Sequence, residues 1–209
     1  MLFLPALLLA ASPPATAAPP FERALLDSFK SACSRVDDLE AMKADALASG
    51  WEEIAEEAEP RIEKLLKLGR EAIGDEGVMT GAYYARSIEG RRLFLLVTRY
   101  EDKEGYWGHG CRIYDFAATA ALDPAGLEAW MGKPPTGVQD LGDGLGKRLW
   151  EPGWRDGMSL EINHVPHDHP MGLAFGIEGN VLLAQAMGGF DKLLSEEPAE
   201  AEPEDKESE

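Results

Sequence analysis

Three of the four histidines lie in the six-residue segment 164–169, which reads HVPHDH. Imidazole nitrogens are common ligands of zinc and other divalent metals, and in an extended or turning segment His167 and His169 point to the same side. Asp168 or Glu161 could add a carboxylate oxygen. The spacing therefore predicts one candidate chemistry, the binding of a zinc-like divalent metal by His164, His167 and His169.

The same segment has a simpler interpretation. Pro166, Pro170 and Gly172 are turn-forming residues, and they predict an exposed hairpin tip between a strand that ends near Val165 and one that starts near Leu173. Structural zinc sites draw their ligands from two separate segments, and the H-E-x-x-H motif of helical zinc enzymes does not occur in the sequence. On this interpretation, metal binding at the segment is adventitious.

No other catalytic motif occurs in the sequence. The glycine-rich segment 140–146 lacks both the context of a phosphate-binding loop and the acids of a calcium loop, so we interpret it as a flexible linker. Ser159 lacks the second glycine of a G-x-S-x-G elbow, and S-x-x-K does not occur. The sequence identifies no catalytic residue and no cofactor-binding motif, which favours a protein that is not an enzyme.

Residues 1–17 have the pattern of a secretory signal peptide. An apolar run is followed by the small-residue ending Ala15-Thr16-Ala17, which is an A-x-A cleavage site. The typical basic residue after Met1 is missing. Pro13 and Pro14 interrupt the apolar run too early for a membrane anchor. We therefore expect a periplasmic or secreted protein with no membrane span after cleavage.

Export changes how the two cysteines, Cys33 and Cys111, are interpreted. In an oxidising compartment a lone pair of cysteines is most simply one disulfide, whereas in the cytosol each would be a buried apolar residue or a reactive thiol. Phe29, Cys33 and Val36 share one helical face, and Cys111 shares a strand face with Ile113. We predict a structural disulfide that ties a helix to a sheet.

The chain of 209 residues carries a formal net charge of -18. Its last fifteen residues, 195–209, hold eight acids against Lys206 and no apolar residue larger than alanine, so we expect a disordered acidic tail. Residues 18–194 suit a single domain. Nucleic acids and anionic lipid surfaces need clustered Lys and Arg, and a strongly acidic chain argues against both as partners.

Helical periodicity precedes any strand pattern. Apolar spacing predicts a helix over 21–36, and Asp37 with Glu40 resembles the capping box of a second helix that ends near Gly50. A third helix is expected over 60–72. A fourth should begin after the cap Asp123 and stop at Gly132.

Short runs rich in β-branched, aromatic and other apolar residues predict strands between and after these helices. The expected strands are 82–88, 92–100, 110–116, 147–150, 158–165, 173–177 and 181–185. The sum is an α+β fold, with N-terminal helices followed by a mostly antiparallel sheet and one further helix. Five aromatic residues flank the expected turns and suggest either a ligand-binding platform or packing at strand ends: Tyr100, Tyr106, Trp107, Trp150 and Trp154.

Four short motifs stand in a recognisable order: Phe29-x-x-x-Cys33, Gly50-Trp51, Cys111, and Ala129-Trp130-Met131-Gly132 with Pro134. Over roughly residues 21–135 this combination resembles a family of short, uncharacterised exported proteins of alphaproteobacteria. The resemblance implies periplasmic export and an α+β domain with paired cysteines, and it implies no activity. The histidine segment and the acidic tail lie outside the shared pattern.

Two classes of function follow. The first is a non-enzymatic exported domain, stabilised by one disulfide, that binds a protein or an envelope component. The second is a metal-binding protein or metal-dependent enzyme that uses the histidine segment. A hydrolase with scattered catalytic residues is a third possibility.

Overall fold

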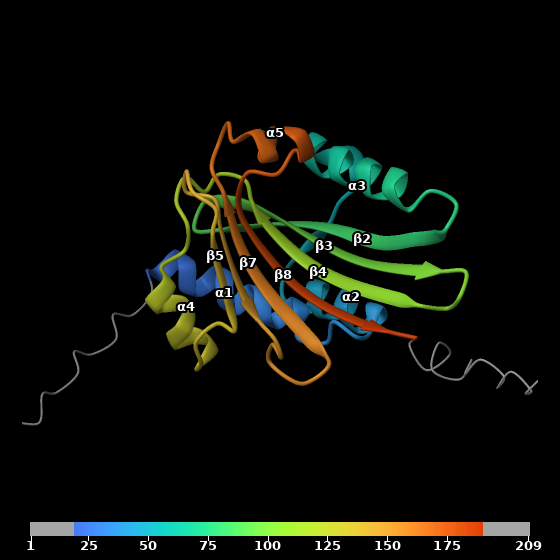
Figure 1. The fold of residues 1–209 in the computed structure, drawn as a ribbon, viewed down its shortest axis with the longest axis horizontal. Coiled ribbons are helices and arrows are strands. Elements are labelled where there is room, and N and C mark those ends of the chain that lie inside the picture. The colour runs from blue at the N-terminus through green and yellow to red at the C-terminus, as the bar shows by residue number, and fades with distance from the viewer. Residues whose placement is uncertain (1–18, 190–209) are drawn as a thin grey trace, which may run out of the picture.

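The computed structural model describes residues 19–189, and the expected signal peptide and acidic tail lie outside these residues. Three helices come before the long strands of the sheet, as the sequence predicts, and one two-residue strand lies between the second and the third helix (Figure 1). The helical elements are α1 (Pro20–Cys33), α2 (Leu39–Ala48), the 3-10 turn η1 (Glu56–Ala58), α3 (Pro60–Ile73), α4 (Pro124–Met131) and α5 (Pro170–Phe175).

The strands form one eight-stranded antiparallel sheet in the order β1-β2-β3-β4-β8-β7-β6-β5, which confirms the α+β prediction. The first four are β1 (Glu52–Glu53), β2 (Gly77–Ile88), β3 (Arg91–Asp102) and β4 (Trp107–Asp115). The last four are β5 (Gly137–Asp140), β6 (Gly146–Trp150), β7 (Met158–Val165) and β8 (Gly179–Gly188). Strand β4 is central because it pairs with β3 on one side and β8 on the other.

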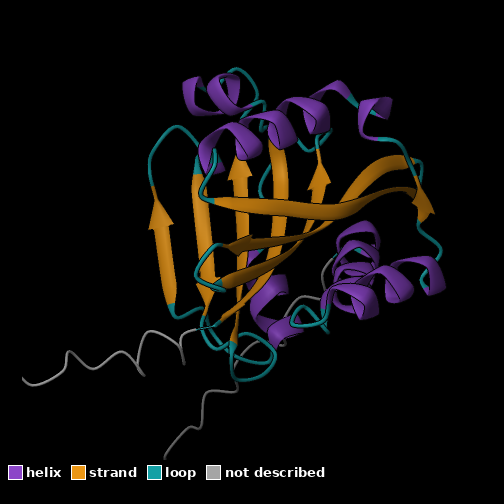
Figure 2. Ribbon diagram, turned by 90° about the vertical axis from the view of Figure 1, so that its right-hand side faces the viewer, coloured by secondary structure: helices purple, strands orange, loops and turns teal. Residues whose placement is uncertain are grey.

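Helices cover the two faces of the sheet unequally (Figures 1 and 2). The larger core lies where α1, α2 and α4 pack on one face, and it includes Leu25, Met42 and Leu127. The smaller core lies on the other face, where α3 contributes Ile62 and Leu66. Because side chains alternate along each strand, every central strand contributes to both layers.

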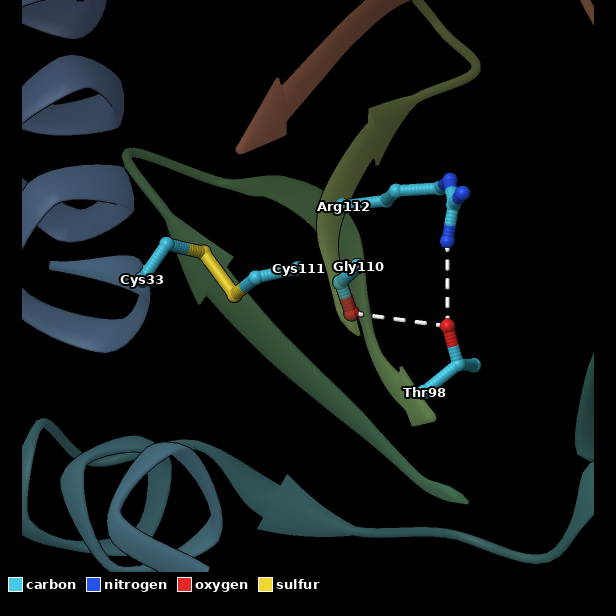
Figure 3. The surroundings of a disulfide bond; sticks show 5 residues. All are labelled: Cys33, Thr98, Gly110, Cys111 and Arg112. Carbon is cyan, nitrogen blue, oxygen red and sulfur yellow. Dashed lines mark hydrogen bonds between the residues drawn. A yellow bond between two sulfur atoms is a disulfide. The ribbon is translucent and has the colours of Figure 1, made fainter. Parts of the chain in front are cut away.

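The predicted disulfide is present between Cys33 on α1 and Cys111 on β4 (Figure 3). Their Cα atoms are 5.5 Å apart, within the usual range for a disulfide, and both side chains are fully buried. Cys111 points to the same side of the sheet as Ile113, as the strand pattern predicted. The bond therefore fixes the first helix to the centre of the sheet.

Two local predictions differ from the structure, and two short strands, β1 and β5, were not predicted. The N-cap of α2 is Asp38, not Asp37, and its carboxylate accepts the N–H of Ala41 at 3.0 Å. The segment 140–146, interpreted as a linker, is the turn of the β5–β6 hairpin, held by the Leu141 N–H to the Leu145 carbonyl at 2.9 Å. With two and four residues, β1 and β5 are too short for the alternation of apolar and polar residues that identifies a strand.

The predicted strand 173–177 is wrong. The chain instead forms α5, whose first turn is capped by the Nδ1 atom of His169, which accepts the Met171 N–H at 3.2 Å. Gly176 ends the helix in the left-handed conformation at φ 73°. An apolar run this short fits a strand and a helix equally well, so capping and turn geometry decide between them.

Candidate functional site

The face of the sheet that carries α3 is only partly covered. Beside α3, the uncovered parts of β3, β4 and β8 form a cavity of about 350 Å³. This volume is within the range of small-molecule sites in proteins. The cavity is the candidate functional site, because its lining combines apolar walls with one group of polar side chains.

The wall on the α3 side is apolar. Leu65, Leu66 and Ile73 reach it from the helix, and Met79 and Leu96 reach it from the sheet. Helical spacing places the three α3 residues on one side of that helix, facing the strands. An apolar ligand segment lying along this wall would be removed from water on both sides.

Two glycines of β4 form the floor. Gly108 and Gly110 lie on the face of β4 that borders the cavity. In the register of the sheet they are opposite Tyr100 and Thr98 of β3. A Cβ atom at Gly108 would meet only Met187 Cγ, at 3.9 Å, so the space above it is open. Glycine in a strand interior often marks the close approach of a ligand or another backbone.

Arg112 lies two residues after Gly110 on β4. Among the described residues that line the cavity, it is the only one of the types Asp, Glu, Lys and Arg. It neighbours Cys111, and the two side chains point to opposite faces of the sheet (Figure 3). Its Nη1 atom donates to the Thr98 hydroxyl at 3.1 Å, and that hydroxyl donates to the Gly110 carbonyl at 3.5 Å. Thr98 therefore positions the guanidinium over the glycine floor.

Within residues 19–189, Arg112 has no carboxylate within the 4.0 Å limit of an ion pair. A guanidinium has five N–H donors, and Thr98 accepts from only one of its nitrogens. The side chain is half-buried, so its remaining donors can serve a ligand that enters the cavity.

Gln185 completes the polar end. In the register of the sheet it lies opposite Gly110, so Thr98, Gly110 and Gln185 form one row across β3, β4 and β8. The hydroxyl of Tyr114 lies further along β4, where burial raises its pKa above the ordinary value. The phenol is therefore neutral at physiological pH, and Arg112 supplies the charge of the site.

Two other hollows are less suited to binding. One, of about 330 Å³, shares Gln185 and Met187 with the cavity but is lined by Glu151 and Asp156. The other, of about 340 Å³, lies between α3 and α5 beside Arg61, which is paired with Glu178 at 2.9 Å. In both, the charged groups are exposed to water or already paired.

The three histidines predicted as metal ligands are not brought together. His164 is buried and bonded through Nδ1 to Asn180 Oδ1 at 2.9 Å. His167 contacts Glu178 at 3.0 Å, and His169 caps α5. The segment leaves β7 and enters a helix, so the predicted hairpin tip is not formed. The part of the chain that the structure describes contains no group of three or more His, Cys, Asp or Glu side chains that could hold a metal ion.

The five aromatic residues do not form one platform. Trp150 is fully buried, and Trp154 packs on Phe29 with ring centroids 5.3 Å apart. Trp107 lies against His109, with a centroid separation of 4.6 Å. Only Tyr100 lines the cavity. The alternative interpretation, packing at strand ends, describes most of the set.

The fourth histidine, His109, lies on the disulfide side of β4 and gives a prediction about pH. Its Nδ1 atom bonds the Val36 carbonyl at 3.1 Å, and it is only 4 % exposed. Burial lowers its pKa below the ordinary value of 6.5, against the opposing effect of the Val36 carbonyl, and Arg99 lowers it too. The unfolded chain therefore binds a proton at His109 more readily than the folded protein does. Stability that is present above pH 6.5 is lost as the pH falls towards the folded-state pKa of His109.

We expect His109→Gln, whose amide can still donate to Val36, to reduce this loss. The measurement is the free energy of unfolding in urea at about pH 7.5 and about pH 5.5, on either side of the ordinary histidine pKa. The wild type should lose more stability between these values than the variant. Equal losses in the two proteins would show that His109 does not cause the dependence.

Sequence reasoning missed the cavity. The signal for Arg112 was present in the strand 110–116, since the face opposite Cys111 and Ile113 carries Gly110, Arg112 and Tyr114. What the sequence lacked was the position of α3, which leaves the glycine part of this face open.

Comparison with known proteins gave no match to a family model, a curated protein or a solved structure. The resemblance to exported alphaproteobacterial proteins therefore stays a prediction. Within residues 19–189, no helix has both the length and the apolar composition needed to cross a bilayer.

Proposed function

We propose that this chain is an exported, non-enzymatic binding domain, stabilised by one disulfide, that holds a component of the cell envelope in the cavity beside α3. One observation carries the proposal: a cavity with apolar walls contains an arginine with no acidic partner among the described residues. Such a combination of an apolar surface and a few oriented polar groups is characteristic of ligand sites.

Two features support the exported location. The pattern of residues 1–17 is that of a signal peptide, and the Cys33–Cys111 disulfide suits an oxidising compartment, where such bonds persist. With both cysteines in the bond, the protein has no thiol nucleophile. The described lining holds no carboxylate, and its one histidine, His109, is bonded through Nδ1 to the Val36 carbonyl, which supports binding over catalysis.

The mass of the exported form follows from the expected cleavage site and the disulfide. Cleavage after Ala17 leaves residues 18–209, and the disulfide removes two hydrogens from that chain. Intact-mass spectrometry of protein from the periplasmic fraction should give this value, and reduction should restore the two hydrogens. A cytoplasmic protein with an intact N-terminus and free thiols would contradict the exported location.

The cavity can be tested by filling it. Gly108→Ile adds a side chain that favours strands and projects over the open floor, whereas Gly108→Ala adds only a methyl group. The probe is N-phenyl-1-naphthylamine, a neutral apolar dye whose fluorescence rises when it leaves water. We expect saturable binding to the wild type, a loss of at least about tenfold in Gly108→Ile and a change within about twofold in Gly108→Ala.

Equal binding by Gly108→Ile and wild type, or no saturable binding at all, would rule out the cavity as the site. Thermal unfolding of the three proteins provides the control for folding. A folded Gly108→Ile variant that no longer binds the dye is the result expected from the proposal.

A further inference from the structure

We infer that the ligand of this cavity is a fatty acid: an unbranched apolar chain along α3 with its single carboxylate bound by Arg112. This inference rests on the proposed function and adds the chemical class of the ligand. It is based on the charge of the polar end, the character of the wall and the charge of the whole chain.

The polar end is matched to a carboxylate. A guanidinium presents a planar fork of N–H donors that a carboxylate accepts in pairs, and charge-assisted bonds of this kind are about twice as strong as neutral ones. Arg112 is held over the floor by Thr98, so its geometry is set before the ligand arrives. A cationic ligand, in contrast, would meet no carboxylate in the described lining.

The remainder of the cavity is matched to a hydrocarbon chain. Leu65, Leu66, Ile73, Met79 and Leu96 provide a wall without polar side-chain atoms. A peptide would carry an N–H and a carbonyl at each residue, and each of these groups needs a partner when it is buried. Side chains able to pair them lie along the sheet, from Tyr100 to Tyr114, and none of the α3 residues on the wall is polar, so an alkyl chain fits that wall better than a peptide does.

The net charge limits how many negative charges the ligand can carry. With -18 on the chain, an anion approaching the protein is repelled, and the repulsion grows with the charge of the anion. Burial of an apolar chain can offset the repulsion of one charge. Arg112 can neutralise one carboxylate. Nucleic acids and other polyanions are excluded on the same grounds.

The test uses ligands with the same chain and different head groups. Decanoate, decanol and decyltrimethylammonium compete with N-phenyl-1-naphthylamine for the mature protein. We expect decanoate to bind at least about tenfold more tightly than either of the others, since a charge-assisted pair is lost in both. Decanoate that binds no better than decanol would overturn the inference even where the dye binds normally.

Arg112→Gln separates the role of the charge from that of the cavity. Its amide can still donate to Thr98 but has no charge, so decanoate affinity should fall about ten- to a hundredfold while the dye and decanol bind as before. The matched control is Arg99→Gln, on the opposite face of neighbouring β3, where the side chain pairs with Glu101 and no loss is expected. Unchanged dye binding shows that each variant is folded.

Each outcome has one meaning. If neither the wild type nor any variant binds the dye, the proposed function fails and the inference fails with it. If the dye binds but Arg112→Gln leaves decanoate affinity unchanged, the cavity is a binding site for another class of ligand and only the inference fails. Tighter binding of a leucine-rich peptide with a free C-terminus than of decanoate would also overturn the fatty acid.

Discussion

Replacing both Cys33 and Cys111 by alanine is expected to lower the free energy of unfolding by about 4 to 5 kcal/mol. The bond closes a loop with a sequence separation of 78 residues, and in the chain-entropy model its loss gives the unfolded chain much more conformational freedom. The typical stability of a domain is about 5 to 15 kcal/mol, so the variant should be close to the limit of folding at growth temperature.

The measurement is denaturant unfolding of oxidised wild type, reduced wild type and the Cys33→Ala/Cys111→Ala variant. Reduction should destabilise the wild type to a similar extent and leave the variant unchanged, because the variant has no bond to reduce. Two buried sites also lose their sulfur atoms in the variant, so reduced wild type isolates the effect of the covalent bond. A loss below about 1 kcal/mol in both would show that the bond is not structural.

Trp150→Ala is expected to lower the free energy of unfolding by about 3 to 5 kcal/mol. The indole is 0 % exposed, in the core formed with α1 and α4, and its N–H donates to the Lys133 carbonyl at 3.1 Å. The substitution removes a large apolar surface, leaves a cavity and deprives that carbonyl of its partner. Trp150 also ties β6 to the segment that follows α4.

Trp150→Phe is the matched control, since it keeps most of the apolar volume and loses the N–H group. We expect it to cost less than half as much as Trp150→Ala, in keeping with a better-filled core, when both are measured by urea unfolding. A similar cost for the two would show that the hydrogen bond to Lys133, and not packing, is the main contribution. A negligible cost for alanine would contradict the packing described here.

Local signals predicted the elements with regular periods and clear ends. The helix expected over 60–72 is α3, Pro60–Ile73, because proline at its start and one apolar side mark it without tertiary information. The fourth helix was bounded as expected. The Asp123 carboxylate accepts the Gly126 N–H at 2.9 Å, and Gly132 ends the helix at φ 71°.

Elements that depend on their surroundings were predicted less well. Strand β2 begins at Gly77, before the expected residue 82, because its first residues pair with the end of β3 and carry no clear alternation of their own. The helix α5 was missed because its apolar residues, including Leu173 and Phe175, are exposed. Their spacing therefore does not show the one buried side by which an amphipathic helix is identified. Pairing and capping, not local composition, fix both segments.

The candidate site was outside the reach of the sequence for a related reason. Strand periodicity shows that Cys111 and Arg112 face opposite sides, but it does not show which side is covered. The cavity exists because α3 reaches Leu96 and leaves the space above Gly108 open, and this is a property of how helix and sheet are placed. The histidine segment had a local pattern, and its residues proved to serve helix capping and strand-end bonding.

The strand order also sets a sequence of events for a chain that emerges from its N-terminus during synthesis. Strands β2, β3 and β4 are successive neighbours and can pair as soon as they emerge, with Cys33 already available to Cys111. The second edge of β4 has to wait for β8, which follows α4 and three further strands. During that interval β4 presents unpaired backbone groups, the state in which strands associate with other chains. The interval before β8 emerges is therefore the stage at which this fold is most exposed to association with other chains.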